Sequence, residues 1–394
     1  MPGTLILGIE SSCDETSAAV VRDGHEVLSN AVASQLIHSN YGGVVPELAS
    51  REHLRAIVPI VREAMQRAGV SYSDLAAVAV TEGPGLAGAL LVGISFAKAL
   101  AFGADLPLIA VNHLEGHIHA VLMGNDFADA NPLLALVVSG GHTHLYLATR
   151  TPKQTWHYRN VGKTLDDAAG EAYDKVAKLL GLPYPGGPWM DVLAAHGTAD
   201  TTLFPFAQIK KKATGNTAPK LSREATLAKE DDPTRFDLSF SGIKTAVRRY
   251  VELHKMQPAI AARAESLRAT GLDKTLPSDP ANVAAALQYF DAETLNLIAS
   301  FQNAVVKNLA RSTFNAAQHY GARGILVSGG VAANSHLRQV FANMASTAGM
   351  PIAFPSIALS TDNAAMIAAA AWPKFLGRHF ASDTLEPTPQ LRLG

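Results

Sequence analysis

Two histidines stand one helical turn apart and could share a metal ion. His113 and His117 are four positions apart, and on a helix that spacing puts their Cβ atoms about 5–6 Å apart on one face. Imidazole nitrogens at this separation suit zinc or iron. From spacing alone, a packing or surface role is the commoner explanation of such a pair. Glu115 faces another side of the helix, so the pattern does not fit a zinc protease, in which the glutamate directly follows the first histidine.

A metal held by two histidines needs at least one further ligand from elsewhere in the chain. Asp362 stands in the segment 360–363, just before an alanine-rich stretch that should form a helix. A carboxylate at this position suits a metal ligand. It also suits a helix N-cap, and the N-cap is the interpretation that the local sequence favours. At this level both roles of Asp362 stay open.

Three short turns rich in small or polar residues directly follow apolar strands. They cover residues 11–16, 139–143 and 328–334. Small side chains let backbone N–H groups converge on phosphate oxygens, and a following helix N-terminus adds a favourable dipole. Each turn alone is explained as a tight connection that needs glycine. Three of them in equivalent positions favour a cleft for a nucleotide or an acyl phosphate.

Two further segments place polar groups near predicted helix starts. Residues 165–175 open a helix with several acids, which the helix dipole explains, but Asp174 lies deeper than that explanation requires. The turn 184–188, which contains Gly187, precedes a helix that bears Asp191. Paired glycines allow close backbone approach to a flat ligand, or simply a sharp corner, and both explanations stay open.

The elements that must position these residues occur twice along the chain. In the first half, the apolar patterns predict strands at Leu5–Glu10, Ser17–Arg22, Val27–Ala33, Leu75–Val80 and Leu108–Asn112, with helices at Pro46–Ala68, Leu86–Phe102 and His113–Val121. In the second half, the same order predicts strands at Leu133–Val138, Thr143–Thr149, Trp156–Val161 and Gly324–Val327, and a helix from about Val331. The repeated layout predicts an α/β fold of two duplicated lobes whose turns face one cleft.

The first lobe is expected at residues 1–125, joined by a C-terminal helix at 372–394, and the second lobe at 126–371. Additional helices are predicted in the second lobe at Asp166–Leu180, Gly187–His196, Ser241–Leu253 and Ala292–Tyr320. Two polar stretches, 210–235 and 262–281, are expected to be loops, the second partly helical, and neither is assigned a role. Lys210–Lys212 is typical of a solvated loop but is also the best local basic patch for a polyanion.

Composition excludes several classes of protein. The 394 residues are too many for one ordinary core. Lys plus Arg number 33 and Asp plus Glu 34, so no global charge favours DNA or RNA, and any RNA contact needs a local patch or a partner. A single cysteine, Cys13, excludes a disulfide framework, and the apolar stretch Leu86–Phe102 contains Lys98, which favours a buried helix over a membrane span. We expect a cytoplasmic protein that is not bound to a membrane.

Together these segments resemble the tRNA N6-adenosine threonylcarbamoyltransferases, a family whose bacterial members are called TsaD. The matching segments are 8–16, 41–53, 83–86, 113–117, 138–143, 166–175, 184–188, 240–242, 328–334 and 361–363. They run over nearly the whole chain. The stretches 210–235 and 262–281 look longer than the family pattern, and Ser360 stands where many members have cysteine. Neither departure touches the expected ligands.

The resemblance implies an α/β fold of the actin, Hsp70 and sugar-kinase type, with a nucleotide cleft between two lobes. It implies transfer of the threonylcarbamoyl group of L-threonylcarbamoyl-AMP to N6 of the adenosine beside the anticodon, in tRNAs that read codons beginning with A. It also implies three partners, which are tRNA, a paralogous TsaB-like subunit and a TsaE-like ATPase.

Roles for individual residues follow from the same resemblance. His113, His117 and Asp362 are expected to bind one iron or zinc ion per subunit. The donor-binding turn is expected to comprise Val138, Ser139, Gly140, Gly141 and His142, and contacts to the nucleotide part are expected from Asp174, Gly187, Asp191 and Asn334. Asp14 and Glu15 are our candidates to take the N6 proton, because the first turn should face the cleft.

Two rival functions remain open at this level. One is an ATP-dependent kinase or chaperone of the same fold, which gives no reason for His113 and His117 to be paired with Asp362. The other is a zinc peptidase, which lacks the usual glutamate base and leaves the three turns unexplained.

Overall fold

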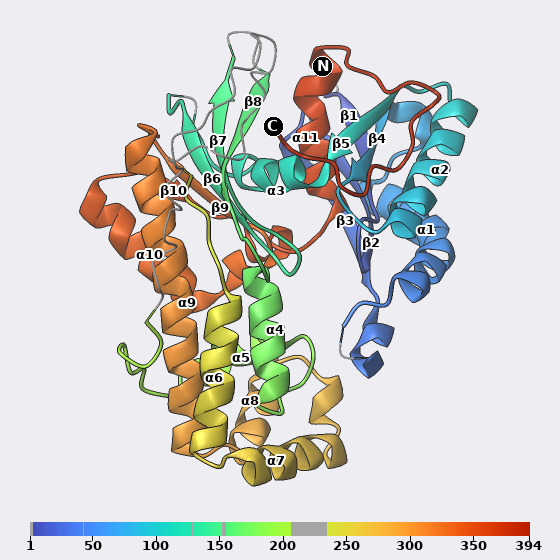
Figure 1. Ribbon diagram of the computed structural model, residues 1–394. Helices are drawn as coiled ribbons and strands as arrows, with labels where there is room; N and C mark the ends of the chain where they lie inside the picture. The colour runs from blue at the N-terminus through green and yellow to red at the C-terminus, as the bar shows by residue number, and fades with distance from the viewer. Residues whose placement is uncertain (1–2, 42, 128, 152–154, 206–234) are drawn as a thin grey trace, which may run out of the picture.

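The computed structural model describes residues 3–41, 43–127, 129–151, 155–205 and 235–394. Two five-stranded sheets lie side by side, and a group of helices extends below the second sheet (Figure 1). The stretch expected as a loop at 210–235, with Lys210–Lys212, lies outside the described residues except for Arg235. Within the described ranges, no helix is long and apolar enough to cross a membrane.

The first sheet has the strand order β3-β2-β1-β4-β5. Its strands are β1 (Leu5–Glu10), β2 (Glu15–Arg22), β3 (Glu26–Ser34), β4 (Leu75–Gly83) and β5 (Leu108–Asn112). Strand β1 pairs antiparallel with β2 and parallel with β4. All six residues of β1 are buried, because both faces of this sheet are covered by helices and a strand buried on two faces has no polar side.

The second sheet repeats this topology. Its strands are β6 (Leu133–Val138), β7 (Thr143–Arg150), β8 (Trp156–Lys163), β9 (Ile325–Ser328) and β10 (Ile352–Ala353). Read from the other edge, their order is β8-β7-β6-β9-β10, with β6 antiparallel to β7 and parallel to β9. The predicted duplication is therefore confirmed strand by strand. The two-residue β10 was not predicted, because so short an edge strand leaves no apolar pattern.

The helices that cover the sheets are exchanged between the two halves. One face of the first sheet packs on α1 (Pro46–Ala68) and α2 (Ala87–Gly103), and its other face packs on α11 (Ala364–Leu376) from the far end of the chain. The second sheet packs on α9 (Ala292–His319) and α10 (Ser335–Ala348) on one face, and on α3 (His113–Leu122) from the first half on the other. Helices α3 and α11 thus lie together between the sheets (Figure 1).

The C-terminal segment differs from its prediction. A helix was expected at 372–394, but α11 covers Ala364–Leu376, and the described residues 377–394 form neither helix nor strand. They are held to the first sheet by backbone hydrogen bonds, including Thr388 N to Glu82 O at 2.9 Å and Ala381 N to Leu108 O at 2.8 Å. Backbone pairing of this irregular kind gives no periodic signal in the sequence. The division into lobes at residues 125 and 371 stays a prediction.

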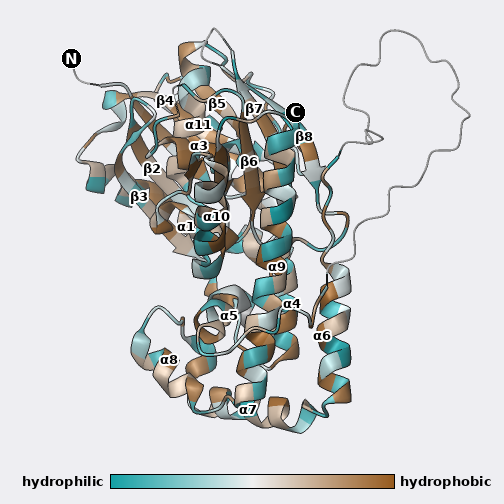
Figure 2. Cartoon of the chain, turned by 90° about the vertical axis from the view of Figure 1, so that its left-hand side faces the viewer, coloured by the Kyte–Doolittle hydropathy of each residue, from teal (hydrophilic) through white to brown (hydrophobic). Residues whose placement is uncertain are grey.

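The helical extension consists of α4 (Ala169–Leu179), α5 (Gly186–Ala194), α6 (Ser241–Leu253), α7 (Gln257–Ala269) and α8 (Pro280–Leu287), packed against α9. In Figure 2 the central strands are mostly brown, while α6 and α9 also carry teal bands, as expected for helices with one exposed face. Short 3₁₀ helices occur at Leu36–Tyr41, Tyr72–Asp74, Leu272–Lys274, Gly330–Ala333 and Ile357–Leu359. The helix predicted from Val331 is therefore a 3₁₀ turn followed by α10.

One predicted helix start in the extension was wrong. Helix α4 begins at Ala169 and not at Asp166, because the Asp166 carboxylate accepts hydrogen bonds from Phe240 N at 2.7 Å and Ser241 N at 3.2 Å and so caps α6. The stretch 262–281 contains most of α7 and the start of α8. This confirms the expectation that the stretch is partly helical. One of its charged residues, Arg263, is buried, and its guanidinium donates to Leu180 O at 2.7 Å and to Thr294 Oγ1 at 2.8 Å.

Because α11 lies so close to the first sheet, we predict that one methyl group added to β1 destabilises the fold. A Cβ on Gly8 of β1 would lie 2.3 Å from the carbonyl oxygen of Ala364, so Gly8→Ala must push α11 away. We expect a loss of about 1–3 kcal/mol in the free energy of unfolding, measured by urea denaturation. Gly103→Ala is the matched control, because nothing lies within 4 Å of a Cβ there, and it should change stability by less than about 1 kcal/mol. Equal effects of both variants would contradict a steric cause.

Candidate active site at the junction of the two central helices

The three expected ligands meet where α3 and α11 begin. His113 is the first residue of α3, and Asn112 before it caps the helix by accepting a hydrogen bond from Leu114 N at 2.9 Å. His117 Nε2 lies 3.2 Å from Asp362 Oδ1, and His113 Nε2 lies 3.7 Å from the same oxygen.

Asp362 is not the cap of α11, as its local sequence favoured. The N-cap of α11 is Asn363, whose side chain accepts a hydrogen bond from Met366 N at 3.1 Å. Asp362 therefore stands just outside the helix, and its carboxylate turns toward the two histidines. Because α11 begins at Ala364, Asn363 is its cap, and Asp362 is left available as a candidate ligand.

The three side chains fit a metal ion. One ligand atom from each of His113, His117 and Asp362 lies within 4.8 Å of the others. Both ring nitrogens of His117 are buried without a well-formed hydrogen bond to any described residue, although Nε2 lies 3.2 Å from Asp362 Oδ1, and buried polar atoms are normally partnered. Two imidazoles and a carboxylate form a donor set that suits zinc or iron. Glu115 points elsewhere, and its carboxylate lies 2.9 Å from Lys374 Nζ on α11.

A second carboxylate, Glu10 at the end of β1, lies behind His113 and was not assigned a role from the sequence. Its side chain is fully buried, and Oε2 lies 3.2 Å from His113 Nδ1. Thr81 Oγ1 donates to Oε2 at 2.7 Å, and Ser12 N donates to Oε1 at 2.5 Å. A carboxylate on the far nitrogen of a histidine sets which nitrogen faces a metal. The available signal was an acidic residue ending an otherwise apolar strand.

The negative charges of Asp362 and Glu10 favour a cation beside the two histidines. Burial lowers the pKa of His113, but the carboxylates of Asp362 and Glu10 outweigh burial and raise it to about 9. Burial raises the pKa of Asp362, but His113 and His117 outweigh burial and hold it well below its ordinary value. Two anionic carboxylates therefore face the imidazoles, and a metal ion would take the place of the proton on His113.

The turn 138–142 leaves its backbone open beside this group. The Ser139 N–H donates to His142 O at 2.8 Å, and the His142 N–H donates to Ser139 Oγ at 3.1 Å. Cβ atoms added to Gly140 or Gly141 would meet nothing within 4 Å. The His142 ring centre lies 6.1 Å from that of His113, and burial, with His113 and His144 nearby, lowers the pKa of His142 to about 3. Its imidazole is therefore neutral at pH 7.

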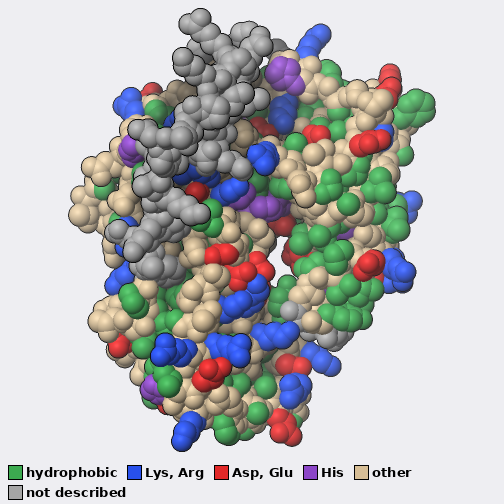
Figure 3. Space-filling model, in the orientation of Figure 1, with side chains coloured by type: hydrophobic (Ala, Val, Ile, Leu, Met, Phe, Trp, Pro, Cys, Tyr) green, Lys and Arg blue, Asp and Glu red, His purple; other side chains and the backbone are tan. Residues whose placement is uncertain are grey.

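Helix α4 begins directly under this turn. Gly170 N in its first turn donates to Ser139 O at 3.2 Å, and a Cβ on Gly170 would lie 2.6 Å from that oxygen. Only glycine therefore lets the turn approach the helix N-terminus. In Figure 3 the molecule is hollowed between its two halves, with acidic and histidine side chains near the upper rim and a group of Lys and Arg side chains below.

The four expected nucleotide contacts fall into two groups, and each of them has a hydrogen-bond partner within the protein. Asp174 Oδ1 accepts hydrogen bonds from Gly186 N at 2.8 Å and Gly187 N at 3.3 Å, so Asp174 caps α5. Asp191 accepts from Ser335 N at 2.9 Å.

Asn334 caps α10, and Gln302 joins it to Asp191. The Asn334 side chain accepts from Leu337 N at 2.8 Å and donates to Gln302 Oε1 at 2.9 Å, while Gln302 Nε2 donates to Asp191 at 3.3 Å. No motif in the sequence indicated this bridging glutamine. Hydrogen bonds of this kind fix the side chains that line the second half's turns.

Asp14 and Glu15 lie across from the second half. Burial raises the pKa of Glu15 well above its ordinary value, and Asp14 adds to this through its charge and a hydrogen bond between the two side chains. The charge of Asp14 also raises the pKa values of Asp174 and Tyr184, which burial has already raised. His53 holds this turn in place, since its Nε2 lies 2.9 Å from Cys13 O and its Nδ1 lies 2.8 Å from Thr16 Oγ1.

Comparison with known proteins decides the family. Residues 26–369 match the family described as "TsaD: tRNA N6-adenosine threonylcarbamoyltransferase". The chain belongs to this transferase family. A tRNA N6-adenosine threonylcarbamoyltransferase of Koribacter versatilis is 56% identical over 398 residues, covering 100% of both chains. A relative of the same name from Syntrophotalea carbinolica is 45% identical, covering 93% of this chain and 90% of its own.

The fold of this family member is also found in a solved structure of distant sequence. Full-length HypF in a phosphate- and nucleotide-bound form is 12% identical, with a TM-score of 0.53, and the match covers 95% of this chain and 46% of that chain. At this identity the likeness shows the fold alone. Together with the duplicated sheets, it confirms the expected two-lobed α/β fold of the actin, Hsp70 and sugar-kinase type.

The ligand geometry predicts which histidines of α3 bind metal. His117→Ala should abolish the binding of a stoichiometric zinc or iron ion, and Glu10→Gln should weaken it by about 10–100-fold, because His113 loses the carboxylate that orients it. The measurement is metal content by mass spectrometry after equilibrium dialysis. His119→Gln is the matched control, since His119 lies on the same helix but bonds Tyr158 Oη at 3.1 Å. Loss of metal in His119→Gln as well would refute the assignment.

Proposed function

We propose that this family member transfers the threonylcarbamoyl group of L-threonylcarbamoyl-AMP to N6 of the adenosine beside the anticodon, in tRNAs that read codons beginning with A. The observation that carries the proposal is the joining of His113, His117 and Asp362 at the start of two central helices, next to the open turn 138–142. Neither the kinase nor the peptidase alternative uses both features.

The donor's adenylate part is assigned to the second half of the chain. Val138, Ser139, Gly140, Gly141 and His142 form the turn that would receive the acyl phosphate, where backbone N–H groups and the start of α4 favour negative charge. Asp174 and Gly187 lie at the start of α5, and Asp191 and Asn334 are linked through Gln302. Their contacts to one another would hold this surface rigid for the nucleotide.

An iron or zinc ion bound by His113, His117 and Asp362 would polarise the acyl phosphate and help to hold the donor. The protein's own contribution is the orientation of the ligands. Glu10 fixes the far nitrogen of His113, and the caps Asn112 and Asn363 fix the two helix starts. The neutral His142 ring beside them adds a polar wall without adding positive charge.

We assign removal of the N6 proton to the carboxyl pair Asp14 and Glu15. Burial and the neighbouring Asp14 carboxyl group raise the pKa of Glu15 well above its ordinary value, because two negative charges so close repel each other. The pair then retains one negative charge that accepts a proton from the attacking amine. In the balanced step, the N6–carbon bond forms, the bond from that carbon to the AMP oxygen breaks, the proton passes to the pair and AMP leaves.

Partners and compartment follow from the family resemblance. We assign a paralogous TsaB-like subunit and a TsaE-like ATPase as partners in bacteria, and the cytoplasm as the compartment. The substrate named for the relatives, tRNA, supports this compartment.

The proposal is tested by incubating the purified chain with threonylcarbamoyl-AMP and unmodified tRNA, with and without the two partner proteins. Modified adenosine, detected by mass spectrometry of digested tRNA, is the expected product. His113→Ala should reduce its formation at least about 100-fold. Absence of modified adenosine in every mixture, together with cleavage of peptides, would overturn the proposal.

The carboxyl pair gives a separate prediction. Asp14→Asn and Glu15→Gln should each lower kcat by about 10²-fold or more, with donor affinity unchanged, because the pair acts on the proton and not on the donor. Unimpaired turnover in both variants would remove the pair from the mechanism.

Stability should respond to pH at the same position. Burial of Glu15 raises its pKa in the folded chain. Between the pKa of the unfolded chain and that of the folded chain, the folded chain binds more protons, so wild type loses stability as the pH rises through this range. Glu15→Gln should therefore melt at a higher temperature than wild type at pH 8, and the difference should vanish near pH 4. A difference that does not depend on pH would contradict burial of the Glu15 carboxyl group as its cause.

A further inference from the structure

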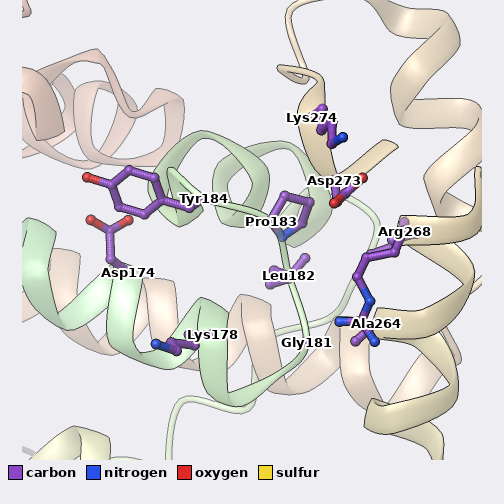
Figure 4. A pocket seen from close by; sticks show the side chains of 11 residues that line it. Asp174, Lys178, Gly181, Leu182, Pro183, Tyr184, Ala264, Arg268, Asp273 and Lys274 are labelled. Atoms are coloured by element: carbon purple, nitrogen blue, oxygen red, sulfur yellow. The ribbon is translucent and has the colours of Figure 1, made fainter. Parts of the chain in front are cut away.

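A basic pocket opens in the helical extension beside the proposed donor site. Its volume is about 450 Å³, and it lies between the C-terminal part of α4 with the turn that follows it and the end of α7 with the 3₁₀ turn Leu272–Lys274 (Figure 4). Asp174 and Tyr184 line the pocket on the side of the active site. Both respond to the charge of Asp14 in the first half, so the pocket adjoins the cleft and continues away from it.

Three cationic side chains from separate elements surround this pocket. Lys178 comes from α4, Arg268 from α7 and Lys274 from the 3₁₀ turn, and all three are exposed. None of them has a side-chain hydrogen bond or an ion pair to any described residue. Three unpaired cations on the lining of one pocket raise the local concentration of anions, although the chain as a whole has a net charge of −1.

The acidic residues of the pocket narrow the chemistry of its ligand. The Asp174 carboxylate accepts a hydrogen bond from Gly186 N of α5, but Asp273 Oδ1 is buried with no hydrogen-bond partner among the described residues. A ligand that satisfies this site carries anionic oxygens for the cations and at least one O–H or N–H donor for Asp273. A ribonucleotide chain carries both, in its phosphodiesters and its 2′-hydroxyls, whereas a simple polyanion carries only the first.

We propose that this pocket binds the backbone of the substrate RNA a few nucleotides from the adenosine that is modified, with Lys178, Arg268 and Lys274 on its phosphates. The inference rests on the proposed function, since it requires an RNA substrate in the adjoining cleft. The pocket is the local basic patch that a chain without excess positive charge needs in order to bind RNA. Lys178, Arg268 and Lys274 are positioning residues, because they lie outside the group that faces the reacting atoms.

The test compares the charge-reversed chain K178E/R268E/K274E with wild type in the assembly that supports modification. Equilibrium binding of labelled, unmodified tRNA should weaken on the order of tenfold or more, and the KM for tRNA should rise in parallel. The KM for the donor, and kcat at saturating tRNA, should stay unchanged. Lys307→Glu is the matched control, because Lys307 is exposed on α9 and does not line the pocket.

A second variant keeps the test decisive if charge reversal disturbs folding. K178A/R268A/K274A should make the dependence of log Kd on log salt concentration less steep by about 2, at about 0.7 for each single-strand phosphate that is no longer bound. Unchanged tRNA affinity and salt dependence, or weaker binding of the donor in place of the tRNA, would overturn the inference. Failure of wild type to modify any tRNA would overturn the proposed function, and the binding experiment would still report on the pocket.

Discussion

Helices α3 and α11 lie against each other between the two sheets, and the positions of both sheets and of the candidate site depend on this contact. Each helix ends one half of the duplicated chain and covers the sheet of the other half. The two helices approach closely at Gly116, where an added Cβ would lie 2.9 Å from Ile367 Cδ1. The ion pair of Glu115 with Lys374 adds a charged link at the same contact. Because the helices pack side by side, their N-termini deliver the histidines and Asp362 to one place.

The duplication also places two chemically different turns at equivalent positions beside the site. In both halves the first and second strands are joined by a turn at the same edge of the sheet. In the first half the acids Asp14, in this turn, and Glu15, at the start of β2, follow the fully buried Glu10. In the second half it carries the glycines Gly140 and Gly141, which leave the backbone open. Equivalent positions thus present carboxyl groups on one side and an open glycine backbone on the other, and the proposed acyl transfer uses both.

The helical extension departs from the symmetry, and polar side chains there hold its helices together. Asp166 caps α6, Asp174 caps α5, and the buried Arg263 joins α7 to Leu180 and Thr294. The bonds of Asp166 lie just before α4, and the first turn of α4 bonds the turn 138–142 through Gly170 N and Ser139 O. The basic pocket at its edge is then held at a fixed distance from the cleft, as a positioning surface for a long substrate requires.

The sequence by itself determined the repeated order of strands and helices, because burial on one or both faces of an element leaves a periodic pattern in the chain. It also determined the family, since motifs spread over nearly the whole chain cannot match by composition alone. It identified the histidine pair, whose spacing follows from the pitch of a single helix.

Only the tertiary structure decided which residues join that pair. Asp362 read locally as a helix cap, but the cap of α11 is Asn363, and the Asp362 carboxylate lies 3.2 Å from His117 Nε2. Glu10 meets His113, and Gln302 meets Asp191, across more than 100 residues of sequence. The three cations of the basic pocket come from separate elements between residues 178 and 274. A periodic pattern records which face of an element is buried, but it does not record what that face meets, since the partner is chosen by packing between distant segments.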